Sequence, residues 1–318
     1  MFSQNNTLEE LNKRRDELFS EKIAYGKYEK PKTLIKLIEL VKENNLDTDR
    51  SLGFILWKGT KPEFPAPIDN IPFAWTGGDG CYFGFLTDFG NNSNLEEAPI
   101  IFVSPADFDK KNPHWGVKLF ARNIKDFLSI MIKTWYAEIV RFNELTEMDF
   151  KGAIKVMHDE YEEFDSDKEK AERKRVIDFI SNNFDLKTID NLNEYYKSLY
   201  AERKELNLIE TMDGIGISNQ ERPKITANSI SEPIEIEQLE SQLNNLSLDE
   251  RKKFYRDVGL YLYPHYEENF NDVLEIMGKY LIRDGFEREA NIVNMGIKLS
   301  KDYKKHIEKK KEKKENER

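Results

Sequence analysis

The sequence predicts an α+β fold: a small, mostly antiparallel sheet with helices on one face, followed by a mainly α-helical C-terminal region. Short apolar runs bounded by Gly, Pro, Asn or Asp are concentrated between residues 53 and 121, which is typical of strands. On both sides of this stretch apolar residues recur every three or four positions, which is typical of amphipathic helices. Helices, then strands, then helices in this order favour an α+β arrangement.

Five strands are expected. They cover residues 53–57, 71–75, 81–87, 99–103 and 117–121. The second and third are joined by Thr-Gly-Gly-Asp-Gly, and because Gly and Asp tolerate positive φ, this run predicts a tight hairpin turn. Gly84 within the third strand permits either a close approach of a neighbouring backbone or a bulge.

The helices have recognisable starts and stripes. Asn123 followed by Asp126 predicts a cap before a long apolar stripe that extends to Phe142. Ser247 followed by Glu250 matches a capping box for a later helix. Between these two starts, Val156, Tyr161 and Phe164 are among the residues that give a highly charged region its helical periodicity.

These patterns divide the chain into five parts. They are a 1–146 α+β domain, a 147–210 charged helical region, a 211–235 linker or extended loop rich in Gly, Pro, Ser and Asn, a 236–300 helical hairpin region and a 301–318 charged tail.

Charge is distributed unevenly along the 318 residues. The tail holds nine Lys and Arg against five Asp and Glu, so residues 1–300 carry a net −14 although the whole chain carries −10. An acidic body disfavours nucleic-acid binding, which needs clustered cations, and suits a basic protein partner. The sequence shows no signal peptide and no apolar run long enough to span a bilayer, and it has a single cysteine. We therefore expect a cytoplasmic protein without membrane contacts.

The sequence lacks the features that several catalytic and ligand-binding motifs require. No lysine follows the glycines of residues 77–80 as a phosphate loop requires, and these glycines precede a strand, where a dinucleotide fingerprint needs a helix. Cys81 would need a base, and only His114 lies in the same predicted domain. His158 and Glu162 share a helical face but lack the second histidine of a zinc motif. We therefore predict no catalytic residue, no metal site and no cofactor.

Four segments together resemble a known family. They are Ile71 to Ala74, Gly78 to Gly80 with the aromatic strand that contains Tyr82 and Phe83, Pro99 to Val103, and the helix start Asn123 to Leu128. In this order they resemble the SUKH superfamily, which has the Syd/Knr-like fold. The resemblance covers about residues 30–145 and leaves the helical region after residue 147 unexplained.

The resemblance implies a non-enzymatic binding domain, and many SUKH-like proteins are immunity proteins that neutralise toxin domains, often nucleases. We expect Trp75, Asp79, Tyr82 and Asp88 to bind the partner, because aromatic residues beside acids make suitable interface anchors. Two alternatives stay open. The chain could be a helical scaffold or assembly protein that acts through its C-terminal half, or a hydrolase that uses Cys81 or Asp79.

Overall fold

The computed structural model describes residues 20–57, 66–108, 115–141, 149–206, 209–219, 234–261 and 270–316. One antiparallel sheet lies at its centre, with its five strands in chain order. The strands are β1 (Ile55–Leu56), β2 (Asn70–Trp75), β3 (Tyr82–Leu86), β4 (Ile100–Val103) and β5 (Val117–Ala121). The α+β prediction is confirmed, and each predicted strand region contains one strand.

The predicted hairpin is present between β2 and β3. Its turn is closed by the Cys81 amide, which donates to the Gly78 carbonyl at 3.1 Å. Asp79 and Gly80 adopt left-handed φ angles of 49° and 71°. Such angles disfavour most side chains but are tolerated by Asp and Gly, which explains why this run forms the turn.

Gly84 provides the close approach expected of it. A side chain at this position would begin 2.7 Å from the Asn70 Oδ1 atom of the neighbouring strand. Opposite Gly84, the pairing register of β2 shifts between Pro72 and Ala74. A bulge there accommodates Pro72, whose nitrogen cannot donate to the ladder.

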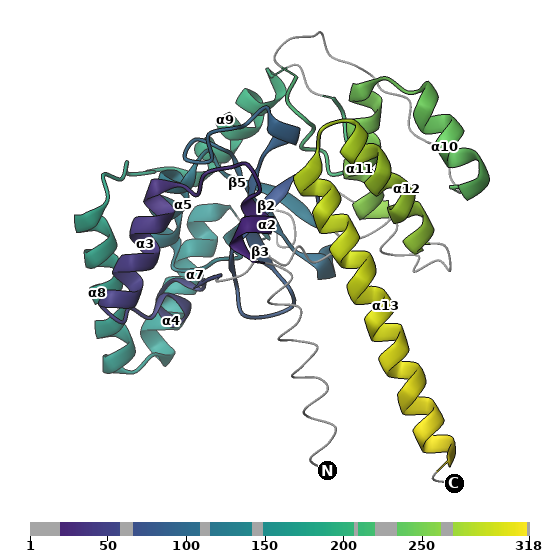
Figure 1. Ribbon diagram of the computed structural model, residues 1–318. Helices are drawn as coiled ribbons and strands as arrows, with labels where there is room; N and C mark the ends of the chain where they lie inside the picture. Colours follow the sequence, from purple (N-terminus) through teal and green to yellow (C-terminus); the bar gives the residue numbers. More distant parts are fainter. Residues whose placement is uncertain are drawn as a thin grey trace.

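Helices lie on both sides of the sheet (Figure 1). On one side are α3 (Lys32–Glu43), α4 (Thr48–Leu52), α5 (Ile124–Thr134), α7 (Phe150–Phe164) and α8 (Asp167–Asn183). On the other are α10 (Ile236–Asn245), α11 (Leu248–Tyr261), α12 (Phe270–Arg283) and α13 (Glu287–Asn316). In the described ranges no helix combines the length and the apolar character that crossing a membrane requires.

Smaller elements complete the architecture. α9 (Leu192–Lys204) runs beside the edge strand β5, where Tyr200 and Tyr195 accept hydrogen bonds from backbone amides at 3.1 and 2.9 Å. α2 (Glu21–Tyr25) packs against α13. Three 3-10 turns are η1 (Asp88–Gly90), η2 (Pro105–Asp107) and η4 (Ile139–Arg141).

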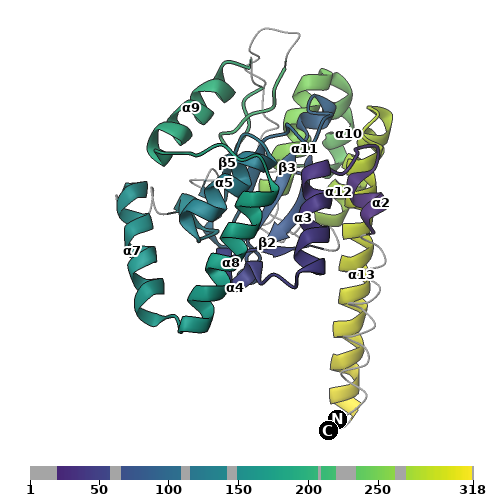
Figure 2. The ribbon, with the colours of Figure 1, turned by 90° about the vertical axis from the view of Figure 1, so that its left-hand side faces the viewer.

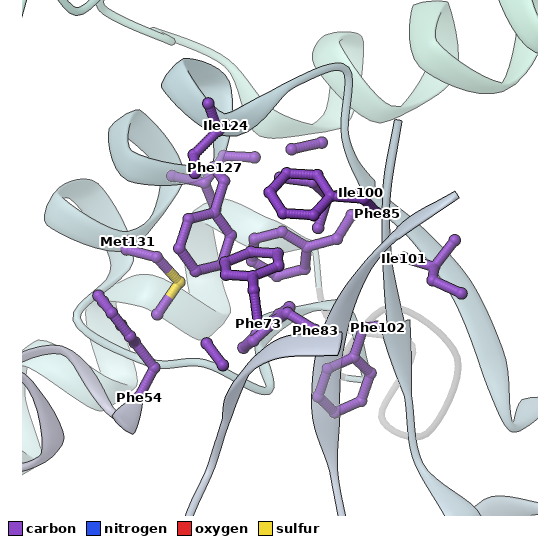
Figure 3. Close-up of a cluster of buried hydrophobic side chains, with 14 of the residues drawn as sticks. Phe54, Phe73, Phe83, Phe85, Ile100, Ile101, Phe102, Ile124, Phe127 and Met131 are labelled. Carbon is purple, nitrogen blue, oxygen red and sulfur yellow. The ribbon is translucent and has the colours of Figure 1, made fainter. Parts of the chain in front are cut away.

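Phe127 of α5 is the centre of the core between this helix and the sheet (Figure 3). Its ring contacts four other phenylalanines, with centroid distances of 5.0 to 5.6 Å, namely Phe54, Phe73, Phe83 and Phe120. The same buried cluster continues into α7, α8 and α9 through Ala153, Val176, Ile180 and Leu199. One core therefore spans the expected boundary at residue 146.

A second buried cluster joins the C-terminal helices to the sheet region. It is formed mainly by α10 to α13, but it includes Ile68, just before β2, and Phe89, just after β3. Ile217 of the expected linker region is buried and pairs as an isolated bridge with buried Ile209, just before that region. Residues 220–233 lie outside the described part. The helical half is thus packed onto the sheet.

The predicted helix that begins at Asn123 is shorter than its apolar stripe. α5 ends at Thr134, because Trp135 adopts a left-handed φ of 57° and its amide closes the last turn on the Met131 carbonyl. The predicted cap is correct, since Asn123 Oδ1 accepts from the Asp126 amide at 3.0 Å. The capping box of Ser247 and Glu250 is also present.

Replacing the cap should weaken the fold measurably. Asn123→Ala removes the acceptor for an amide at the start of α5, so we expect the free energy of unfolding to fall by about 1 kcal/mol. Urea denaturation followed by circular dichroism measures this change. Asn123→Ser, which keeps a capping oxygen, should lose clearly less, and equal losses in the two variants would contradict a capping role.

Candidate functional site

The end of the β2–β3 hairpin exposes a tryptophan. Trp75 is 38% exposed, although it belongs to an otherwise buried strand. Its ring stacks on half-buried Trp57, with centroids 6.2 Å apart and planes inclined by 29°. Trp57 in turn meets the ring of Tyr82 edge-on at 6.2 Å. Strand pairing places Trp75 opposite Tyr82, so the three rings form one row that leads from the interior to the surface.

Two exposed carboxylates accompany this tryptophan. Asp79 occupies the hairpin turn itself. Asp49, on α4, lies beside the turn: its Oδ1 is 3.8 Å from where a side chain at Gly77 would begin. We call Asp49, Trp57, Trp75 and Asp79 the hairpin-turn face. The aromatic ring can stack on lysine and arginine side chains of a partner. The carboxylates can accept charge-assisted hydrogen bonds from the same cations.

Of the four predicted partner-binding residues, two are exposed and two are buried. Trp75 and Asp79 are exposed and lie at the hairpin turn. Tyr82 and Asp88 are buried, and Asp88 lies at the opposite end of β3 from the turn. Asp88 is therefore corrected from a surface residue to an internal one, because two arginines from distant helices reach it. Tyr82 packs edge-on against Trp57 and so supports the tryptophan pair.

Asp88 belongs to a buried group of ion pairs. Arg203 of α9 donates from both terminal nitrogens to its carboxylate, each at 2.7 Å. Arg256 of α11 donates to Asp88 at 3.1 Å and, through Nε, to Asp69 at 2.9 Å. Both arginines also donate to the Gly216 carbonyl, at 2.6 and 2.7 Å. We call Asp69, Asp88, Arg203 and Arg256 the arginine–aspartate cluster.

The environment of this cluster sets the pKa values of its members. Burial alone would raise the pKa of Asp88, but Arg203 and Arg256 outweigh it and lower the pKa to about 2. For Asp69, burial together with the nearby Asp88 and Glu289 carboxylates raises the pKa, although Arg256 acts to lower it. The cluster is closed to solvent, so it joins the ends of β2 and β3 to the C-terminal helices and offers no surface to a ligand.

Arg288 reinforces the same junction from α13. Its buried guanidinium donates to the Asn70 carbonyl at 2.6 Å and to the Ile68 carbonyl at 3.4 Å. It also pairs with Glu289 at 3.0 Å. Three arginines from three helices therefore hold one end of the hairpin, while the other end presents the hairpin-turn face.

Cys81 has the setting of a packed thiol. It is fully buried, and its Sγ lies 3.4 Å from the Ser104 Oγ. Burial raises the pKa of the thiol, which lowers the fraction of reactive thiolate. His114, the one histidine of the same predicted domain, lies outside the described residues.

His158 packs against an aromatic ring. It stacks on Trp135 with centroids 3.7 Å apart, and burial lowers its pKa. Within the described ranges, no group of three or more His, Cys, Asp and Glu residues is arranged to hold a metal ion.

The most useful residue that sequence reasoning missed is Trp57. It ends a predicted strand and carries no motif, and only the pairing of β1 with β2 places it under Trp75. Comparison of the chain with protein-family models, with curated proteins and with solved structures finds no match, so a function must be argued from the hairpin-turn face and from the resemblance in sequence.

Proposed function

We propose that this chain is a non-enzymatic, cytoplasmic, SUKH-like protein that holds a basic protein partner on the hairpin-turn face, and that it acts as an immunity protein against a nuclease-type toxin. The observation that carries the proposal is the exposed Trp75, stacked on Trp57 at the end of a hairpin whose turn contains exposed Asp79 and lies beside exposed Asp49. The proposed function involves no cofactor, no nucleic acid and no membrane.

An exposed tryptophan is a strong candidate for an interface anchor. Trp is enriched among the residues that dominate binding energy, because its large ring buries much apolar area at a small entropic loss. Here Trp57 and Tyr82 restrain the ring of Trp75 before any partner arrives. Such preorganisation lowers the entropy lost on binding.

Charge supplies the chemistry of the partner. The chain carries a net −10, and exposed Asp49 and Asp79 lie at the turn that follows the exposed tryptophan. An acidic surface accelerates the approach of a cationic protein, and this acceleration weakens as salt is added. A nuclease must bind phosphates with clustered cations, so a nuclease domain fits this description.

Trp75→Ala should weaken binding of the partner by about 30-fold, corresponding to about 2 kcal/mol. The partner is first captured with the intact tagged protein from its host at low and high salt and identified by mass spectrometry. Calorimetry then gives the dissociation constants of purified variants. Asp79→Asn removes the charge but keeps a side chain that tolerates the left-handed φ of the turn, so it should mainly slow association.

A matched control is Ile282→Ala, which alters another exposed apolar residue, 56% exposed on α12. It should leave affinity unchanged. Full affinity in Trp75→Ala together with a loss in Ile282→Ala would overturn the proposal and favour the alternative, a scaffold that acts through its C-terminal helices.

A further inference from the structure

The turn between α7 and α8 exposes a phenylalanine. Phe164, the last residue of α7, is 77% exposed, more than any other large apolar residue in the part of the chain that the structure describes. Exposing such a ring to water is unfavourable unless something covers it. Phe164 is therefore the side chain in this region that most requires an explanation.

The backbone around Phe164 is held on both sides. Asp165 pairs with Arg173, whose guanidinium is buried and lies over the ring of Tyr161 at 4.3 Å. Ser166 and Glu169 form a complete capping box at the start of α8. The turn is thus regular, and the exposure of Phe164 is a property of the folded turn.

A second apolar residue of α7 is exposed. Val156 lies eight residues before Phe164, about 80° away around the helix. The inward side of the helix, with Phe150 and Ala153, packs on α5 and α9. Phe164 lies eleven residues after Ala153, so it continues the same stripe at the C-terminal end of α7, where it remains exposed.

The charges around Phe164 indicate which surface would cover it. Residues 159–169 contain seven Asp and Glu but a single Lys. Glu162 and Asp165 are partly neutralised by Lys170 and Arg173. An apolar ring surrounded by carboxylates suits a partner surface in which an apolar pocket is bordered by Lys or Arg. This is the chemistry already proposed for the partner of the hairpin-turn face.

The two features belong to one end of the molecule. α4 contacts the first half of α8, where Arg50 reaches Glu169 at 3.5 Å and the Asp47 amide donates to Glu172 at 3.3 Å. Asp49, between Asp47 and Arg50 in the chain, lies beside the β2–β3 turn. Figure 2 shows α4 next to α8, below the sheet. α4 therefore bridges the hairpin-turn face and the α7–α8 turn.

We infer that Phe164 is a second apolar anchor for the same basic protein that binds the hairpin-turn face. The inference rests on the proposed function, because it assigns the partner by continuity with that face. The interface then extends from Trp75 across α4 to the α7–α8 turn, and a single cationic protein covers both aromatic residues.

Site-specific crosslinking in the full-length chain tests this directly. The photoreactive residue p-benzoylphenylalanine is placed at position 75, 164 or 282 in separate proteins, which are irradiated in the host cell. We expect positions 75 and 164 to crosslink to one and the same protein with an excess of Lys and Arg, and position 282 to give no such product. With that protein purified, Phe164→Ala should raise the dissociation constant about tenfold, and Phe164→Tyr should restore it.

The outcomes distinguish the two proposals. A product at position 75 but none at 164, with unchanged affinity in Phe164→Ala, would overturn the second anchor and leave the proposed function intact. A basic partner crosslinked at 164 but never at 75 would overturn the hairpin-turn face as its site. Different proteins at the two positions, or none at either, would also refute a shared interface.

Discussion

A chain that ends at residue 146 is expected not to fold, although it contains the whole predicted α+β domain. Truncation removes Val176, Ile180 and Leu199 from the core that includes the sheet, so their partners become exposed. It also removes Arg203 and Arg256, which leaves the Asp69 and Asp88 carboxylates without their cations. Uncompensated buried charges alone destabilise by about 3–5 kcal/mol, a large part of the total stability of most domains.

Circular dichroism and urea denaturation of the 1–146 fragment measure this directly. We expect no cooperative transition and little ordered signal. A chain that ends at residue 302 keeps both buried clusters and should unfold cooperatively, like the intact protein. A stable, cooperatively unfolding 1–146 fragment would show that the sheet does not depend on the helical half. If the fragment is unfolded, point variants and not deletions must locate the binding site.

The positions of the strands along the chain could be predicted from the sequence because their signals are local. A change of hydrophobic period marks the start of the strands, and Gly and Asp define the turn at residues 77–80. The same holds for the caps at Asn123 and Ser247, where both partners lie within three residues. Such features depend on neighbours in the chain and need no knowledge of the tertiary fold.

The arginine–aspartate cluster could not be predicted for the opposite reason. Asp88 and Arg203 are 115 residues apart, and Asp69 and Arg256 are 187 apart. In a chain in which 34% of residues are charged, nothing in the sequence pairs these four with each other. Asp88 therefore resembled a surface acid beside an aromatic strand.

The candidate site was partly predictable. Trp75 and Asp79 follow from the hairpin, since a turn residue and the last residue of a strand tend to reach the surface. Phe164 was predicted only as part of a helical apolar pattern. Its exposure could not be foreseen, because the pattern does not say how far along α7 the core extends.

Arg256→Met should lower the free energy of unfolding by about 3–5 kcal/mol, the largest effect expected of any single substitution described for this protein. The arginine is fully buried, and it alone joins Asp69 to Asp88. Methionine fills similar volume but cannot pair with the Asp69 carboxylate or donate to the Gly216 carbonyl. The Gly216 carbonyl would keep its hydrogen bond from Arg203, but the Asp69 carboxylate would be buried without its arginine, which is unfavourable in a medium of low polarity.

A surface ion pair provides the control. Lys279 and Glu240 lie 3.4 Å apart with both side chains exposed, so Lys279→Met should change stability by less than about 1 kcal/mol. Urea denaturation of both variants gives the comparison, and equal, small losses would mean that the cluster contributes little. Adding Asp69→Asn to Arg256→Met removes the orphaned charge and should recover part of the loss. Partial recovery would separate the role of charge balance from that of packing, because asparagine restores neutrality without refilling the space.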